Sequence, residues 1–428
     1  EIELALHTSI KSFFASHGEE AFRVREAAHT VKALRETTPT IFALGGGAVT
    51  QAVVREALRE HAVTVFVDLD PAVAWERVKD SDRPLAQERG AFFALHDQRR
   101  PIYREVADAV ARDADDVVLA AAGVHVERGA LQRLHELVPG DGPVALVSDP
   151  HVAGIDGADA QLALRGRLAE THELPLGEEA KTLAAVDRLW QELRLDRTGT
   201  IVALGGGCTT DAAGFAAATY LRGIPWVPVA TSLVAQVDAA IGGKTAIDLP
   251  QGKNLVGAFH WPAATVIDPA LLETLPDAQR REGMSEVVKT GLLAGEPLWE
   301  LPDDELVRRC AAFKSAVCLR DPYDRGERKM LNLGHTFAHG LEAAAGYEGV
   351  THGQAVALGL LAALRLSGRE TDVVEELLQP KPVRVDRDRA WEALLRDKKG
   401  ALRLVLLDGY DVDVPAEDVR RELDRLIA

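Results

Sequence analysis

The chain has 428 residues, of which 47% are hydrophobic and 27% are charged, and its formal net charge at pH 7 is −17. That length predicts two or three domains, and the composition is typical of a soluble globular protein. The acidic balance argues against nucleic acid as a partner, since phosphate binding needs a basic face. No apolar run reaches the roughly 18 residues that a membrane span needs.

The N-terminus and the cysteines indicate the cellular setting. The first residues, EIELALHTSIKSFF, lack the basic start and the small-residue cleavage site of a signal peptide. They also lack a Met, so we expect the natural chain to begin earlier. Three cysteines (Cys208, Cys310 and Cys318) form neither a disulfide framework nor a C-x-x-C metal motif. A reducing, cytoplasmic setting is therefore predicted.

Strand-like and helix-like runs alternate along the chain, which predicts parallel βα units. The first strands are expected at residues 40–44 (TIFAL) and 63–67 (VTVFV). The turn cluster PGDGP at 139–143 is suited to a domain boundary, and a new strand is predicted at 144–148 (VALVS). From about residue 276 the pattern is mostly helical, apart from a predicted strand at 402–407 (LRLVLL).

Two triple-glycine turns follow predicted strands, in IFALGGGAV (41–49) and IVALGGGCT (201–209). In the second turn, glycines 205–207 precede a helical run and let the backbone approach a pyrophosphate at the helix N-terminus. A plain tight turn is the alternative, because Cys208 and Asp211 do not fit the G-x-G-x-x-G pattern. The residues that flank the two triple-glycine segments do not match, so we favour two separate origins over an internal duplication.

A Gly-rich segment, DAAIGGKT, follows at 238–245. Its Gly-Lys-Thr does not make a phosphate-binding P-loop, because Asp238 stands where that motif needs Gly. Lys244, Lys253 and Asn254 remain as two cations and an amide in a Gly-rich loop. A solvated basic loop is the alternative interpretation.

Imidazoles and a carboxylate in the helical part predict a metal site. His335 and His339 are four residues apart in HTFAH and therefore share a helix face. Thr336 stands where a zinc protease has its glutamate, which disfavours peptide hydrolysis. With His352, and with Glu286 from another helix, the set predicts a catalytic zinc site with an open position. Spacing alone does not decide which two histidines bind, and a hydrogen-bonded imidazole is the alternative for each.

Several long blocks together resemble the 3-dehydroquinate synthase family. They are GGGCTTDAAGFAAATYLRGIPW, TSLVAQVDAAIGGKTAIDLPQGKNLVGAF, EGMSEVVKTGL, ERKMLNLGHTFAHGLEAA and THGQAVALGL. They occur in the family's order, and the resemblance covers roughly residues 144–428. It implies a Rossmann-like α/β domain at 143–275 that binds NAD, and a mostly helical metal- and substrate-binding domain at 276–428.

The same resemblance implies roles for individual residues. The ligands of Zn²⁺ (or Co²⁺) would be Glu286, His335 and His352, with His339 handling protons nearby. The reacting substrate would contact Lys244, Lys289, Arg328 and Asn332, and it would be bound further by Arg222, Asn254, Lys314 and one of Lys398 or Lys399. NAD would contact Asp149, Glu178, Lys181, Gly206, Gly207, Asp211, Thr231, Asp238 and Thr274, with Lys253 at the junction of the two sets.

Two positions depart from the family pattern. His151 stands where the family often has Asn, which bears on the cofactor contacts. Gln354 stands where Glu is usual, beside the ligand His352, and bears on the surroundings of the metal.

The implied reaction converts 3-deoxy-D-arabino-heptulosonate 7-phosphate to 3-dehydroquinate and phosphate, in the shikimate pathway to aromatic amino acids. NAD oxidises the C5 alcohol beside the metal, phosphate is eliminated, the hydride returns, and an internal aldol addition closes the ring. The lysines and Arg328 would clamp carboxylate and phosphate, which requires a basic pocket inside an acidic protein. A homodimer is also predicted.

Other functions are weighed against this one. The first alternative is another sugar-phosphate cyclase, or an iron-type alcohol dehydrogenase, of the same fold. Lys314, Asn332 and the run Asp-Lys-Lys at 397–399 favour the shikimate-pathway substrate over those. The second is a non-catalytic module made of two decayed enzymes, against which the intact metal and lysine set argues.

Residues 1–115 resemble shikimate kinase instead. The likeness depends on GEEAFRVREA (18–27), ALGGGAV (43–49), RPL (83–85) and RRPIYREVAD (99–108). It implies a P-loop-kinase-like α/β domain at 1–138, truncated at its N-terminus, with Arg83 on a lid over ATP. A surface cation is the alternative for each Arg. The shikimate pocket would be lined by Arg23, Gly45, Gly46, Gly47 and Arg99.

No G-x-x-x-x-G-K-[ST] occurs in the 428 residues. The backbone cradle and the Lys that support phosphoryl transfer are therefore missing. We expect this chain, as it stands, not to phosphorylate shikimate. A trimmed product of a kinase–synthase fusion is favoured over a degenerate kinase, because the chain starts inside the fold without Met.

Overall fold

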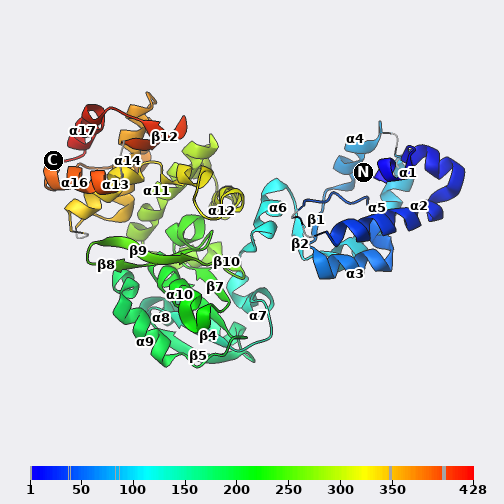
Figure 1. The fold of residues 1–428 in the computed structure, drawn as a ribbon, viewed down its shortest axis with the longest axis horizontal. Coiled ribbons are helices and arrows are strands. Elements are labelled where there is room, and N and C mark those ends of the chain that lie inside the picture. Colours follow the sequence, from blue (N-terminus) through cyan, green and yellow to red (C-terminus); the bar gives the residue numbers. More distant parts are fainter. Residues whose placement is uncertain are drawn as a thin grey trace. The chain divides into compact units, whose positions relative to one another are not determined.

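The structure is a computed structural model that describes residues 2–36, 38, 40–81, 83–85, 87–346, 349–397 and 402–428. The chain forms two compact units, residues 1–121 and 122–428, which are blue to cyan and cyan to red in Figure 1. None of the helices in the described part of the chain has the length and apolarity that a membrane crossing needs.

The first unit consists of helices around a two-stranded parallel sheet, in which β1 (Val65–Val67) pairs with β2 (Ala109–Ala111). Helix α2 (Ile10–Leu34) is capped by the Ser9 hydroxyl and kinks at Gly18, where φ is +79°. The core lies between α2, α3 and the end of α5. The remaining helices are α1 (Ile2–Leu6), α3 (Ala52–His61), α4 (Pro71–Val78), α5 (Arg89–Val106) and α6 (Ala114–Ala121).

The strand predicted at residues 40–44 is not formed. In the described part of the chain these residues have no ladder partner, and Ile41 is 98% exposed. A strand needs neighbours to pair its backbone N–H and C=O groups, and local propensity does not supply them. The similar run at 200–204 (TIVAL) forms a buried strand, because β4 and β7 pair with it on its two sides.

The second unit is built on a six-stranded parallel sheet with the order β3-β10-β7-β6-β4-β5. Chain order reverses between β4 and β6, which makes a topological switch point of the kind where open α/β sheets bind ligands. The strands are β3 (Val124–Val126), β4 (Val144–Ser148), β5 (Leu168–Glu173), β6 (Thr200–Gly205), β7 (Trp226–Ala230) and β10 (Thr265–Ile267).

Both faces of this sheet are covered by helices. Ala145 and Val147 of β4 pack with α9 (Leu183–Glu192) and α10 (Gly207–Thr219). Val144 and Leu146 pack on the other face with α7 (Leu134–Leu137) and α8 (Pro150–Ala163). Burial on both sides explains why the central strands β4, β6 and β7 are mostly apolar along their whole length, whereas the edge strand β5 alternates half-buried and exposed residues.

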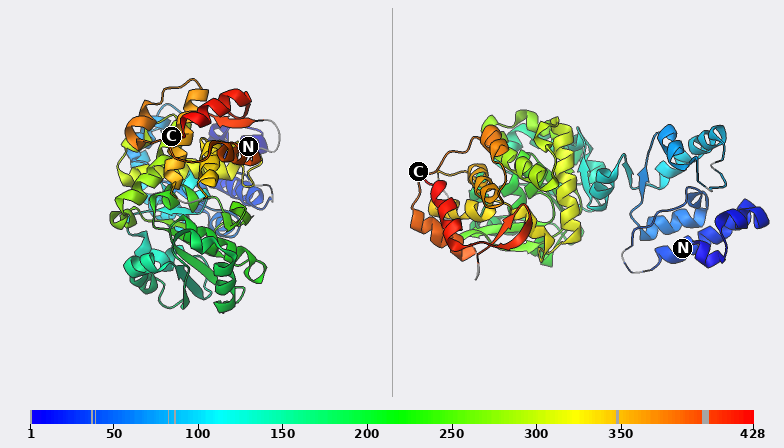
Figure 2. Two further views of the ribbon diagram at one scale, coloured as in Figure 1. Left: turned by 90° about the vertical axis from the view of Figure 1, so that its left-hand side faces the viewer. Right: turned by 90° about the horizontal axis from the view of Figure 1, so that it is seen from above.

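The rest of the second unit is mostly helical and lies beside the sheet, yellow to red against green in Figures 1 and 2. An antiparallel hairpin of β8 (Lys244–Leu249) and β9 (Gly252–Phe259) precedes it. The predicted strand at 402–407 is β11 (Arg403–Leu406), which pairs with β12 (Gly409–Asp413). The helices are α11 (Asp277–Ala294), α12 (Asp303–Arg320), α13 (His335–Ala344), α14 (His352–Leu366), α15 (Asp372–Leu378), α16 (Arg387–Asp397) and α17 (Ala416–Arg425).

The boundary between the units lies earlier than the predicted end of the first domain at residue 138. β3 pairs in parallel with β10, so the residues after 121 belong to the second unit. This pairing joins segments far apart in the chain, and turn signals do not reveal it. Residues 143–275 and 276–428 share one compact unit, and their division into two domains stays a proposal.

Candidate active site

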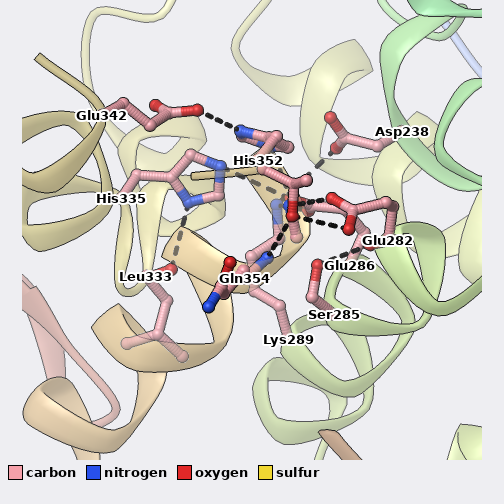
Figure 3. A network of polar contacts seen from close by, with 12 residues as sticks. Asp238, Glu282, Ser285, Glu286, Lys289, Leu333, His335, Glu342, His352 and Gln354 are labelled. Carbon is pink, nitrogen blue, oxygen red and sulfur yellow. Dashed lines mark hydrogen bonds and ion pairs between the residues drawn. The ribbon is translucent and has the colours of Figure 1, made fainter. Parts of the chain in front are cut away.

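A carboxylate and two imidazoles from three helices meet in the second unit (Figure 3). Glu286 lies within α11, and His335 and His352 are the first residues of α13 and α14. One ligand atom of each residue lies within 4.8 Å of the others. The Nε2 atoms of His335 and His352 are 3.5 and 3.3 Å from Oε1 of Glu286. The fold thus brings together the three residues that the sequence suggested as ligands.

Close backbone contact between α13 and α14 places the two histidines. Gly334, just before His335, has φ +79°, and a Cβ there would lie 2.8 Å from the backbone N of Leu360 in α14. A Cβ on Gly359 of α14 would in turn clash with the carbonyl of Gly334. Two glycines therefore permit an approach that side chains would prevent.

The environment of the triad fits a divalent cation. Glu286 is fully buried, and its carboxylate faces the two imidazoles and the ammonium group of Lys289, with which it forms an ion pair. His335 Nδ1 lies 3.2 Å from the carbonyl of Leu333, and a proton on that nitrogen leaves the Nε2 lone pair facing Glu286. Two imidazoles and one carboxylate are the ligands of catalytic zinc, and the second imidazole nitrogen usually has such a partner.

The pKa values of the triad are set by burial and by the charged groups around each residue. Burial alone would raise the pKa of Glu286, but Lys289 and the two imidazoles hold it well below its usual range. Burial lowers the pKa of His335 to about 3, so that imidazole is neutral. Burial also acts to lower the pKa of His352, but Glu286 and Glu342 outweigh it and raise the value to about 10. The carboxylates of Glu286 and Glu342 therefore favour the protonated, positively charged form of His352.

Basic side chains gather beside the triad. Lys289 is buried, forms an ion pair with Glu286 and lies 3.7 Å from Oδ1 of Asp238. Lys314 donates from Nζ to Oδ1 of Asp238 at 2.8 Å. Burial acts to raise the pKa of Asp238, but the two lysines lower it to about 2. The pair of ammonium groups thus shares one carboxylate, which an anionic ligand could replace.

Further cations lie around the Gly-rich loop that ends in Lys244. Arg328, 1% exposed, donates from Nη2 to the carbonyl of Gly242 at 2.9 Å. Lys244 donates to Oδ2 of Asp324 at 2.6 Å. Asn332 ends the turn that carries Arg328. The exposed ring of His339 lies beside that of His335, with 5.7 Å between the ring centres.

Several of the residues predicted to bind NAD lie at the carboxyl ends of β4, β6 and β7. Asp149 caps α8 and accepts the N–H groups of His151 and Val152, each at 3.0 Å. Gly206 caps α10, and Gly207 is its first residue. Thr231 follows β7, and its N–H donates to the carbonyl of Gly205 at 3.0 Å. β4 and β6 flank the switch point, so this edge presents helix N-termini to a ligand.

A second set of predicted cofactor residues forms ion pairs between α10, the hairpin β8–β9 and the turn at 177–181. Lys181 donates to Oδ2 of Asp211 at 2.7 Å and also to Asn254. Lys253 donates to Oε1 of Glu178 at 2.9 Å. The pKa of Lys181 is raised, because the neighbouring carboxylates outweigh its burial. These contacts hold the hairpin against α10.

Not every predicted residue joins these clusters. Arg222 is exposed with φ +70°, and Thr274 is exposed at the end of the turn Pro269–Thr274. Within the described ranges, no hydrogen bond or ion pair links either residue to the triad or to the lysines. Lys398 and Lys399 lie outside the described residues.

In the first unit, most of the residues predicted to line a shikimate pocket lie close together. Arg23 is buried and bonds to Oε2 of Glu26 at 2.6 Å and to Oε1 of Glu19 at 3.0 Å, and Arg99 lies 3.8 Å from Glu19. A Cβ on Gly47 would clash with the guanidinium of Arg23. A Cβ on Gly45 would lie 2.6 Å from Oε1 of Glu26, and one on Gly46 would lie 2.8 Å from the hydroxyl of Tyr103. Arg83 is exposed, and no described ion pair joins it to this cluster.

Three carboxylates at the second unit's site were not predicted from the sequence. Asp324 pairs with Lys244, Glu342 contacts His352, and Glu282 binds the start of α14. A weak signal exists for two of them. Glu282 is four residues before Glu286 and Glu342 is seven after His335, so each shares a helix face with a ligand.

This fold and site define a Rossmann-like α/β protein joined to a helical part that carries a candidate metal triad. The family models for the N-terminal and C-terminal parts of 3-dehydroquinate synthase match residues 171–282 and 283–399, and that for shikimate kinase matches residues 1–127. The 3-dehydroquinate synthase of Bordetella pertussis is 38% identical, over 71% of this chain and 95% of its own. That of Gloeobacter violaceus is 42% identical, over 70% and 95%. The chain belongs to the 3-dehydroquinate synthase family, as the sequence blocks predicted.

Solved structures agree with this fold class. A 2-deoxy-scyllo-inosose synthase complexed with carbaglucose-6-phosphate, NAD⁺ and Co²⁺ is 26% identical, with a TM-score of 0.63 over 71% of this chain and 96% of its own. A 2-epi-5-epi-valiolone synthase from Streptomyces hygroscopicus with NAD⁺ and Zn²⁺ bound is 25% identical, with a TM-score of 0.60 over 71% and 94%. An iron-containing alcohol dehydrogenase from Thermotoga maritima, 16% identical with a TM-score of 0.51 over 71% and 97%, shares the fold alone.

Proposed function

We propose that this chain converts 3-deoxy-D-arabino-heptulosonate 7-phosphate to 3-dehydroquinate and phosphate, using NAD and a divalent metal ion. The observation that carries this proposal is the triad of Glu286, His335 and His352, built around a buried carboxylate, with basic side chains directly beside it. Membership of the 3-dehydroquinate synthase family supports the same reaction.

Glu286, His335 and His352 would hold the metal, Zn²⁺ or Co²⁺, which are the ions in the similar solved synthases. Such an ion would polarise the oxygen of the substrate's C5 alcohol. NAD, which would bind at the carboxyl ends of β4 and β6, would accept a hydride and return it within one turnover. The exposed ring of His339 would exchange protons with the substrate beside His335.

The basic side chains would bind the anionic ends of the substrate. Lys314 and Lys289 share Asp238, and Lys244 is held by Asp324. A phosphate or carboxylate would replace these partners and keep the ammonium groups neutralised. Arg328 is fixed by backbone carbonyls and would present its guanidinium without reordering. The pocket would thereby bind anions although the chain as a whole carries a net charge of −17.

We further propose a cytoplasmic setting and a small-molecule partner in place of nucleic acid. Three free cysteines support the first, and the acidic net charge supports the second. The homodimer stays a prediction, and so does the expectation that these residues do not phosphorylate shikimate.

Phosphate release from the seven-carbon substrate tests the proposed reaction. We expect the purified chain to release phosphate only with NAD and a divalent metal, without net accumulation of NADH. His335→Ala should bind metal poorly and lose more than about 100-fold in turnover, because metal stabilisation is worth several kcal/mol. An exposed substitution remote from the triad, His135→Ala, is the control.

Two results would reject the proposal. Steady formation of NADH from a simple alcohol would indicate a dehydrogenase of the same fold. Turnover of a non-acidic sugar phosphate alone would indicate a different cyclase.

A further inference from the structure

Glu282 accepts hydrogen bonds from the residues on both sides of His352. It lies in α11 one turn before Glu286, and its Oε1 accepts the hydroxyl of Thr351 at 2.6 Å. Its Oε2 accepts the N–H of Gly353, also at 2.6 Å. One carboxylate therefore binds the residue before His352 and the residue after it, at a helix N-terminus, where negative charge is favoured.

The backbones of the two helices are in direct contact at the same point. A Cβ on Gly353 would lie 2.6 Å from Cα of Glu282 and 2.7 Å from its carbonyl oxygen. The start of α14 therefore cannot slide along α11 without breaking this contact. Because Glu286 is on α11 and His352 is on α14, the contact sets the separation of the two ligands.

Glu342 of α13 contacts the ring of His352 from the other side. Its side chain is 4% exposed, and its Oε1 lies 3.3 Å from Nδ1 of His352. The Nε2 of the same ring faces Glu286 at 3.3 Å. The side chain of His352 is 39% exposed, so packing alone constrains the ring little. Figure 3 shows the contact with Glu342 as a dashed line.

We propose that Glu282 and Glu342 are positioning residues that fix the backbone and the ring of His352 for metal binding. The inference deepens the proposed function and depends on it, since it assumes that the triad holds a metal. Glu342 would orient the ring through Nδ1, as carboxylates next to metal-binding histidines do. Glu282 would hold α14 at the distance from α11 that the three ligands require.

Titration of the metal-free protein with Co²⁺ tests this inference directly. The affinity and the visible absorption of bound Co²⁺ are measured for the wild type, Glu342→Leu and Glu282→Ala. We expect each variant to bind Co²⁺ about 10–100-fold more weakly, with an altered absorption band that reports changed geometry. Asp277→Asn, an exposed change of charge on the same helix α11, should leave both readouts unchanged.

Glutamine variants separate positioning from folding. Glu342→Gln and Glu282→Gln keep the side-chain shape and part of the hydrogen bonding, so we expect a smaller loss of affinity with an unchanged Tm of the metal-free protein. Wild-type affinity and spectrum in all four variants would overturn the inference. Failure of the wild type to bind Co²⁺ or Zn²⁺ would instead overturn the proposed function.

Discussion

Buried charges near the triad are compensated by neighbours that the sequence does not reveal. Lys289 lies between Glu286 and Asp238, and Lys314 is paired with the same aspartate. An unpaired ammonium group in such a place would cost several kcal/mol, so pairing is required even without ligand. The site is therefore organised before substrate arrives, which lowers the cost of binding.

The cysteines provide a pH-dependent prediction at the residue scale. Burial raises the pKa of Cys208 and of Cys310 to about 12, and it also raises that of Cys318. Because only the thiolate is nucleophilic, the folded protein should react with iodoacetamide far more slowly near pH 8 than in guanidinium chloride. The rate should increase as the pH approaches 12, as long as the fold persists. Mass spectrometry of the alkylated protein measures this, and rapid labelling of the native protein would contradict it.

At the scale of elements, helix packing decides where the ligands lie. α13 and α14 touch through Gly334 and Gly359, and α11 and α14 touch through Gly353. Each contact lies within a few residues of a ligand or one helix turn from it. The three helices also share one buried core, so displacement of one would move the others.

Gly359→Ala tests the contact between α13 and α14. The added methyl group would clash with the carbonyl of Gly334, and such overpacking costs about 1–3 kcal/mol. We expect a lower urea midpoint and weaker metal binding. The matched control is Gly154→Ala in α8, where nothing lies within 4 Å of the new Cβ. That substitution should be neutral or should stabilise by up to about 1 kcal/mol through helix propensity. Equal midpoints for the two variants would contradict the packing argument.

At the scale of the whole molecule, every described residue of the proposed synthase site lies in the unit of residues 122–428. The six-stranded sheet and the cores on its two faces also lie entirely within that unit. The first unit has a separate core and matches a different family. The two units are therefore expected to be independent in folding and in ligand binding.

Expression of residues 122–428 alone tests this independence. We expect the fragment to fold, to bind Co²⁺ with the affinity of the full chain and to release phosphate from the substrate. Circular dichroism and Co²⁺ titration provide the measurements, with the full chain as the reference. A fragment that is folded but has lost metal binding would show that the first unit contributes to the site.

The sequence by itself determined the family, the parallel α/β class of the sheet and the residue types at the metal site. Short stretches of sequence encode these features. The succession of strand, glycine turn and helix predicts the sheet, and the sequence blocks around Glu286, His335 and His352 predict the triad. Such signals survive without tertiary information because each depends on residues close together in the chain.

Only the tertiary structure decided which segments meet. It placed His352 beside Glu286 and His335, a choice that the spacing of the histidines left open and that the family resemblance had implied. Among the described residues it left 40–44 (TIFAL) without strand partners, although almost the same letters at 200–204 (TIVAL) form a buried strand. It also assigned β3 to the second unit and placed Glu282 and Glu342 around His352. The physical reason is common to all four: long-range pairing and packing depend on what approaches from elsewhere in the chain, and local propensity and spacing do not contain that information.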